Sequence, residues 1–114
     1  MDDVLVPDKL ARIRELNDAL RSSFTGGKVM MTASVMQLPD MVRATALTMM
    51  AQFEAFDEKN DPYGEHDFGR FELCNRTFLF QISYFGRTYD EPSDDPADPE
   101  RTRRVIVLML AQDY

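Results

Sequence analysis

The ten residues 60–69 carry the side chains best suited to chemistry. They include the only histidine of the chain, His66, directly between the carboxylates of Glu65 and Asp67. Consecutive side chains of an extended segment point to opposite sides, so these three converge only where the backbone turns tightly. A proline and two glycines in the same stretch favour such a turn.

A metal site is one interpretation of this stretch. Asp57 or Asp61 would add oxygen ligands, and one histidine with two or three carboxylates suits magnesium, manganese or iron. The spacing gives this idea no support, because a paired-histidine helix signature is absent and Pro62 stands where a calcium loop from Asp57 requires glycine. A small metal-assisted hydrolase is therefore kept as the alternative, with no catalytic residue, metal ligand or cofactor assigned.

Acid–base chemistry is a second interpretation, since histidine exchanges protons near neutral pH and a neighbouring carboxylate would orient it. The nucleophile would be Cys74, Ser83 or a threonine, and none of them stands in a recognisable nucleophile elbow.

A purely structural role is the third interpretation. Asn60-Asp61-Pro62 is typical of a turn closed by side-chain-to-backbone hydrogen bonds, and Gly64 supplies a positive φ. His66 then ties the loop to a backbone carbonyl, and Tyr63 and Phe68 anchor the loop on a helix end. We expect this structural role for His66.

The net charge of −7 is concentrated in two segments of the chain, residues 54–67 and 90–100. Such a chain is repelled by nucleic acid and by anionic membranes, because binding to phosphate requires a basic footprint. Direct binding to DNA, RNA or membranes is therefore not expected. Solvated loops are one explanation of the acidic segments, and a docking surface for a basic partner is the other.

On the second explanation the sequence predicts a small acidic protein-protein interaction module. The predicted partner-binding residues are Asp57, Glu58, Asp61, Tyr63, Glu65, His66, Asp67, Asp90, Glu91, Asp94, Asp95 and Asp98. The partner would be the basic surface of a host or competitor protein. The sequence leaves the oligomeric state open.

Length and composition indicate one domain over residues 1–114, since 44% apolar residues suffice for a core without metal or disulfide. Cys74 has no second cysteine to pair with inside the chain, which fits a reducing cytoplasm, and we expect it to be a core thiol. The acidic N-terminus does not resemble a signal peptide, and no apolar run reaches membrane-spanning length. A cytoplasmic protein is expected.

Hydrophobic periodicity predicts two helices and four strands. The first helix covers residues 8–21, with Ile13 and Leu20 facing the core, and the second runs from residue 38 to Phe56. Its apolar side chains recur at spacings of three and four, ending in Phe53 and Phe56. Strands are predicted at residues 28–33, 69–73, 77–84 and 105–111, with a three-residue turn at 74–76 and a mobile acidic loop at 86–99.

The last predicted strand, residues 105–111, is apolar on both faces, which is typical of a central strand. A buried C-terminal helix is the alternative for this run. With the strand, the order is α-β-α-β-β-β. The expected fold class is α+β, with two helices packed on a mostly antiparallel sheet of about four strands.

Four segments resemble a known bacterial family. They are Ile13-Arg14-Glu15-Leu16-Asn17-Asp18, the ten residues 60–69, Asp95-Pro96-Ala97-Asp98-Pro99 and Met109-Leu110-Ala111. Together they resemble the family known as domain of unknown function 3768, whose members are small proteins often carried on plasmids and other mobile elements. The resemblance implies a genomic setting, not a catalytic residue. In that setting, the sharpest expectation is an inhibitor of a nucleic-acid-directed defence complex of the host, such as a restriction or CRISPR effector.

Overall fold

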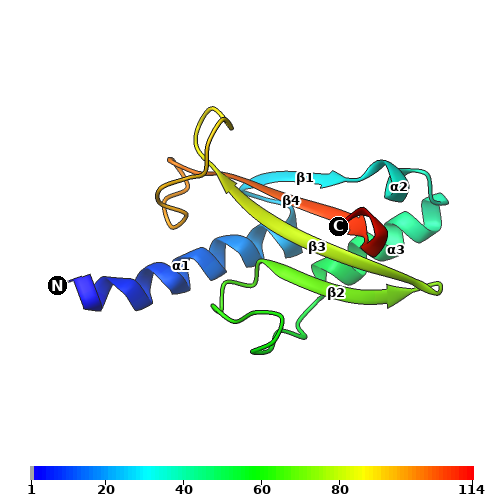
Figure 1. The fold of residues 1–114 in the computed structure, drawn as a ribbon, viewed down its shortest axis with the longest axis horizontal. Helices are drawn as coiled ribbons and strands as arrows, with labels where there is room; N and C mark the ends of the chain where they lie inside the picture. Colours follow the sequence, from blue (N-terminus) through cyan, green and yellow to red (C-terminus); the bar gives the residue numbers. More distant parts are fainter. Residues whose placement is uncertain (1) are drawn as a thin grey trace.

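Three α-helices, four strands and one short 3-10 helix make up the fold of residues 2–114 (Figure 1). The computed structural model describes the backbone of residues 2–114 and the side chains of residues 9–114. The elements in chain order are α1 (Asp2–Ser23), β1 (Gly27–Met31), α2 (Ala33–Met36), α3 (Asp40–Ala51), β2 (Phe68–Leu73), β3 (Arg76–Phe85), β4 (Arg103–Leu110) and η1 (Ala111–Asp113). No helix among these described residues is long and apolar enough to cross a membrane.

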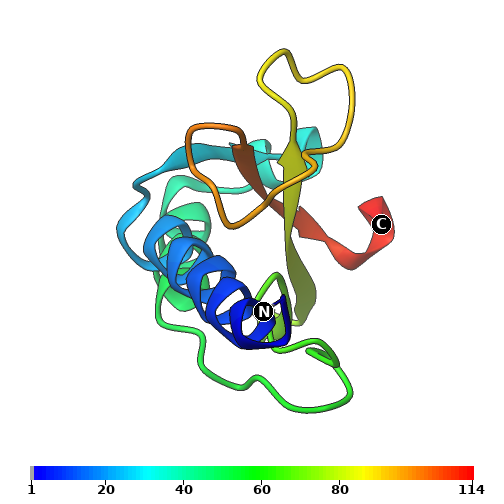
Figure 2. The same ribbon diagram turned by 90° about the vertical axis from the view of Figure 1, so that its left-hand side faces the viewer.

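The four strands form one mixed sheet in the order β1-β4-β3-β2. The pairs β2–β3 and β3–β4 are antiparallel, and only β1 runs parallel to β4. Helices α1 and α3 lie together on one side of the sheet (Figure 2), which we call the helix face, and the opposite side is the outer face. This confirms the predicted α+β class and the predicted order, with α2 as an additional short helix that the sequence pattern did not indicate.

The core lies between the helix face and the two longer helices. Alternate residues of the central strands are directed into it, among them Phe78 and Phe80 of β3 and Ile106 of β4, and each of these is fully buried. Leu20 of α1 and Met50 of α3 cover them from the helix side. The apolar run is thus a central strand, as predicted, because β4 has a paired strand on both edges, although the strand ends at Leu110 and Ala111 already belongs to η1.

Helix α3 ends earlier than the sequence predicts. It ends at Ala51, yet Phe53 and Phe56 still reach the core from the extended segment that follows. The Phe53 ring meets the Phe80 ring edge to face, with centroids 5.2 Å apart. Gly69 of β2 makes this approach possible, because a Cβ at that position would overlap both rings. The spacing of the two phenylalanines therefore reflects burial, not continued helix.

Helix α1 begins at Asp2, six residues before the predicted start at residue 8. Pro7 and Asp8 suit the first turn of a helix by residue type, but their side chains lie outside the described part of the chain.

The β2–β3 hairpin is confirmed, but its turn has two residues, not three. Leu73 pairs with Arg76, and both turn residues have positive φ, 53° at Cys74 and 60° at Asn75. Two positive φ values define a type I′ turn, which matches the twist of the flanking strands. Cys74 is exposed in this turn, so the predicted core thiol is wrong.

Candidate functional site

Both acidic segments lie at the same end of the sheet. The first acidic loop (residues 57–67) leads into β2, and the second acidic loop (residues 86–102) connects the end of β3 to the start of β4. Because β2–β3 and β3–β4 are antiparallel, these three strand ends meet at one end of the sheet, to the left in Figure 1. Helix α1 passes between the two loops.

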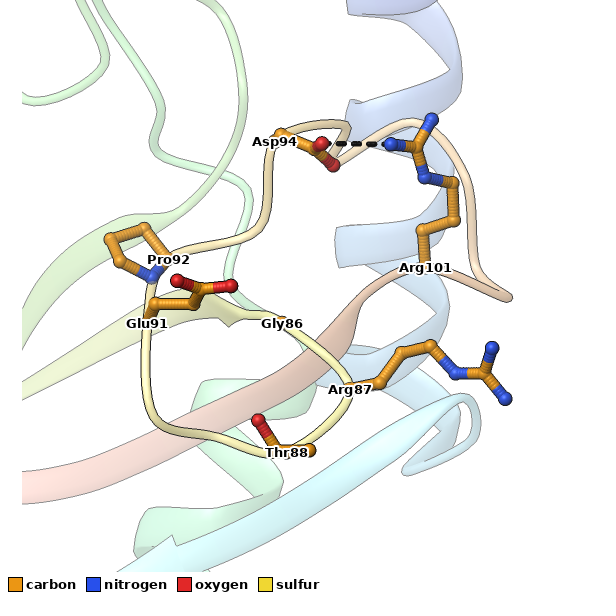
Figure 3. A pocket seen from close by; sticks show the side chains of 7 residues that line it. All are labelled: Gly86, Arg87, Thr88, Glu91, Pro92, Asp94 and Arg101. Carbon is orange, nitrogen blue, oxygen red and sulfur yellow. Dashed lines mark hydrogen bonds and ion pairs between the residues drawn. The ribbon is translucent and has the colours of Figure 1, made fainter.

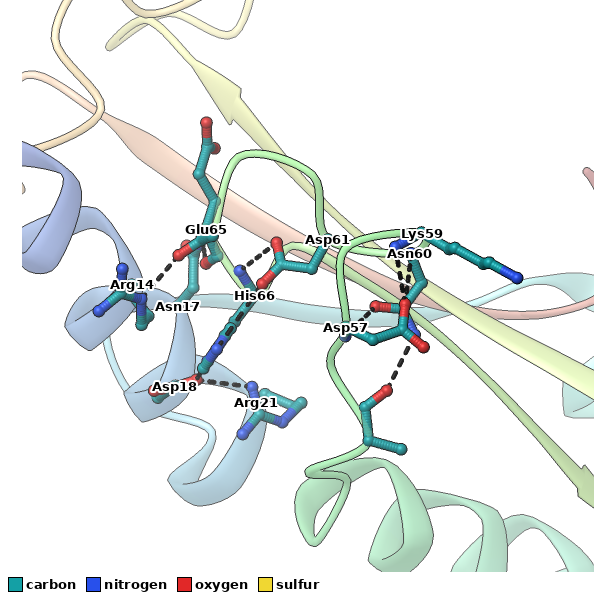
Figure 4. Close-up of polar contacts among 12 residues, drawn as sticks. Arg14, Asn17, Asp18, Arg21, Asp57, Lys59, Asn60, Asp61, Glu65 and His66 are labelled. Atoms are coloured by element: carbon teal, nitrogen blue, oxygen red, sulfur yellow. Dashed lines mark hydrogen bonds and ion pairs between the residues drawn. The ribbon is translucent and has the colours of Figure 1, made fainter.

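His66 attaches the first acidic loop to α1. Its Nδ1 lies 2.9 Å from Oδ1 of Asp18, and its Nε2 lies 3.7 Å from Oδ2 of Asp61 (Figure 4). The imidazole stacks flat on Phe56, with centroids 4.0 Å apart. His66 therefore holds the loop in place, as expected, but through the carboxylate of Asp18 and not through a backbone carbonyl.

Asp18 and Asp61 are both engaged in this contact. The Arg21 guanidinium donates to Asp18 Oδ1 at 2.8 Å and lies over the Phe56 ring. Asp61 is buried, and its Oδ1 accepts the backbone N–H of His66 at 3.1 Å. Asp61 is therefore part of the loop's internal structure, which makes it a poor contact for a partner.

A second network joins both acidic loops to the sheet. Asn17 is fully buried, and its Nδ2 donates to the Glu65 carbonyl at 3.0 Å and to the Tyr84 hydroxyl at 2.8 Å. Its Oδ1 accepts from Arg104 Nε at 2.7 Å, and Arg104 Nη2 donates to the Pro96 carbonyl of the second loop. One asparagine thus connects α1, both loops and the ends of β3 and β4.

Burial changes the ionisation of three groups at this end of the sheet. It raises the pKa of the Asp67 carboxyl, and the negative charge of Glu65 adds to the effect. Burial also raises the pKa of Tyr84, which therefore stays protonated and donates to Glu65 Oε1 at 2.6 Å. It lowers the pKa of Arg104, although a guanidinium remains charged at neutral pH.

The structure does not bring together the residues of the two alternative interpretations, a metal site and an acid–base site. Glu65 is directed to Tyr84, whereas His66 is directed to α1. Across the described residues, no three histidine, cysteine, aspartate or glutamate side chains are placed to hold a metal ion together. Cys74 lies in the hairpin turn at the opposite end of β2 from His66, too remote to serve as its nucleophile.

Other residues of the first loop lie where a partner can reach them. Asp57 and Glu58 are exposed, and Asp57 Oδ1 accepts the backbone N–H groups of Lys59 and Asn60, which lowers the pKa of its carboxyl. Tyr63 is 77% exposed, so it does not anchor the loop.

Phe68 does not anchor the loop either, because it begins β2 and faces Tyr114, with ring centroids 6.1 Å apart. The aromatic residues that pack beside the end of α3 are instead Phe53 and Phe56.

The second loop is partly neutralised by its own arginine. Asp94 pairs with Arg101 at 2.7 Å beside a hollow of about 530 Å³ (Figure 3). Asp95 Oδ1 lies 3.8 Å from Nζ of Lys9 in α1. The Asp98 carboxylate accepts the backbone N–H of Glu100 and so closes a turn. The predicted mobility of this loop stays a prediction. Its base is tied to the sheet, since Ser93 N–H donates to the Tyr84 carbonyl.

Sequence reasoning missed the residues that hold the loops together, namely Asn17, Asp18, Arg21 and Arg104. Asn17 falls on the apolar stripe of α1, and Arg104 is the second of two arginines that begin an otherwise apolar strand. A polar side chain at a core position was the available signal, because a buried polar group requires a hydrogen-bond partner.

The fold and the site define a class of protein: an α+β domain with helices on one face of a mixed four-stranded sheet and two carboxylate-rich loops at one end. The family model described as "Protein of unknown function (DUF3768)" matches residues 31–113, and the chain belongs to this family. No curated protein and no solved structure matches the chain. The matched range contains both acidic loops and three of the four resembling segments, whereas residues 13–18 of α1 lie outside it.

Proposed function

We propose that this protein is an interaction module whose two acidic loops bind a basic surface of another protein. The observation that carries the proposal is topological: the antiparallel strands bring two separate acidic segments to one end of the sheet. Carboxylates gathered at one end of a molecule attract basic partners and discriminate against acidic ones.

Several carboxylates of these loops remain available to a partner. Glu58, Asp90, Glu91 and Glu100 are exposed, and none forms an ion pair with a side chain of residues 9–114. The internal contacts of Asp61 and Glu65 hold the loop backbone in place. Because the loops are already fixed to α1 and to the sheet, binding would cost less conformational entropy than ordering a free segment.

The sharpest form of the proposal is inhibition of a nucleic-acid-directed defence complex of the host. A surface that binds DNA or RNA is basic, and carboxylates gathered at one end of the sheet can occupy it in place of phosphates. The net charge of −7 and the mobile-element setting implied by the family resemblance support this choice of partner.

Neutralising the free carboxylates tests the proposal. We expect the variant Glu58→Gln, Asp90→Asn, Glu91→Gln to fold normally, because these side chains are exposed and form no ion pair with a side chain of residues 9–114. Tagged native protein and variant are incubated with a bacterial lysate at low and at moderate salt, and the retained proteins are identified by mass spectrometry. Native protein is expected to retain a stoichiometric basic partner that moderate salt releases, and the variant is expected to lose it at low salt.

A matched control distinguishes the loss of the loop carboxylates from a general effect of the net charge. Gln37, Gln52 and Gln112 are exposed and lie outside both loops, so replacing all three by lysine shifts the net charge by the same three units. This control should keep the partner. Equal retention by native protein and loop variant, or equal loss in the control, would contradict the proposal.

A further inference from the structure

Strand β2 is an edge of the sheet, with β3 on one side and no strand of residues 2–114 on the other (Figure 1). The Asp67 carbonyl accepts the Ile82 N–H at 2.8 Å, so every second residue from Asp67 onward directs its backbone groups to β3. The alternate residues, Phe68, Arg70 and Glu72, therefore direct their N–H and C=O groups away from the sheet. Unpaired backbone groups in such a row can form hydrogen bonds with a strand of another chain.

The side chains along this edge are accessible. Arg70 and Glu72 lie on the outer face, where their side chains are 66% and 60% exposed. Phe71 and Leu73 lie on the helix face and are only half-buried, although Phe71 stacks on Phe78. The edge thus combines unpaired backbone groups with partly uncovered apolar side chains.

The charge pattern of the edge is complementary to itself. Arg70 and Glu72 have opposite signs and are two residues apart on the same face. If two such strands run antiparallel around a two-fold axis at Phe71, Arg70 of each strand stands opposite Glu72 of the other. Opposite charges facing each other across a strand pair stabilise it.

We propose that β2 pairs with β2 of a second copy of this chain, joining two sheets into one of eight strands. In this register, Arg70 and Glu72 are the residues that exchange both backbone hydrogen bonds across the new pair. Phe71 faces Phe71 of the second copy, and Leu73 faces Gly69. The contact is isologous and closes after two copies.

The charges also exclude the neighbouring registers. A shift that keeps the outward backbone groups paired places Arg70 opposite Arg70, or Glu72 opposite Glu72. Like charges directly opposite destabilise a strand pair. The two-fold axis at Phe71 is therefore the register that the side chains select.

Charge exchange tests this register. The molar mass of the native protein is measured by sedimentation equilibrium over a concentration series up to about 1 mM, the range in which weak contacts become populated. Native protein should dimerise with increasing concentration. Arg70→Glu and Glu72→Arg should each raise the dissociation constant at least about tenfold, because each creates two like-charge contacts per dimer. Circular dichroism should show that both remain folded.

Two combinations restore the complementarity. The double variant R70E/E72R exchanges the charges within each strand and should dimerise as the native protein does. An equimolar mixture of Arg70→Glu and Glu72→Arg should form a heterodimer, because the glutamates of one chain face the arginines of the other. A monomer at every concentration, or equal dimerisation of the single variants and the native protein, would overturn the proposal.

Discussion

Asp67 is the carboxylate of the first acidic loop whose ionised form the fold disfavours. Burial and the charge of Glu65 raise its pKa above the usual value of 3.8. A carboxyl whose pKa is higher in the folded than in the unfolded protein reduces stability as the pH rises. The penalty is absent below pH 3.8 and complete above the pKa of the folded state.

Replacing Asp67 by asparagine should therefore stabilise the protein at pH 7, on the order of 0.5 kcal/mol, a size typical of partly exposed positions. The gain should vanish below pH 3.8. Urea unfolding of the native protein and the variant at pH 7 and below pH 3.8 measures this gain in stability. Asp57→Asn in the same loop should show the opposite sign, because hydrogen bonds lower the pKa of Asp57. Equal effects of the two substitutions at pH 7 would contradict the opposite pKa shifts of Asp67 and Asp57.

The candidate residues were visible in the sequence, but their contacts were not. His66 is the only histidine of the chain, and it stands between two carboxylates. Its real partner, Asp18, lies 48 residues earlier on α1. Sequence patterns report spacing within one element, whereas this contact depends on how α1 packs beside the loop. Tyr63 and Phe68 were misplaced for the same reason, since an aromatic residue in a polar loop does not reveal which side it packs on.

At the scale of elements, the hairpin turn carries strain that its sequence does not relieve. Cys74 and Asn75 both adopt positive φ, where asparagine followed by glycine is preferred. The double substitution Cys74→Asn, Asn75→Gly should therefore raise the free energy of unfolding by about 1 kcal/mol. Thermal or urea unfolding measures the gain. Cys74→Ala is the control, because alanine keeps the strain, and an equal gain from alanine would show that removal of the thiol matters instead of turn geometry.

Elements with strong periodicity were predicted well. The alternating β3 and the apolar β4 were placed correctly, because burial on one or both faces of a sheet leaves a direct trace in the sequence. The end of α3 was not, since Phe53 and Phe56 keep helical spacing after the helix has ended. Helix α2 has only four residues, too few for a periodic pattern.

At the scale of the whole molecule, the separate parts of the polar end depend on one buried side chain. Asn17 bonds to the first loop through the Glu65 carbonyl and to Arg104, which in turn bonds to the second loop at Pro96. Asn17→Ala would leave these buried groups without their partner. An unsatisfied buried polar group costs about 1–3 kcal/mol, so we expect a loss of about 2–4 kcal/mol.

The same substitution should loosen both loops together. Hydrogen exchange followed by mass spectrometry at short times should show faster exchange in residues 57–67 and 86–102 of Asn17→Ala, because the first loop loses its hydrogen bond to Asn17 and Arg104, which holds the second loop, loses its acceptor on α1. Asn60→Ala is the matched control. Asn60 bonds only within the first loop and to Ala55, so faster exchange should stay confined to that loop. If Asn17→Ala affected one loop alone, the two acidic segments would be independent, and a partner would not meet them as one prearranged surface.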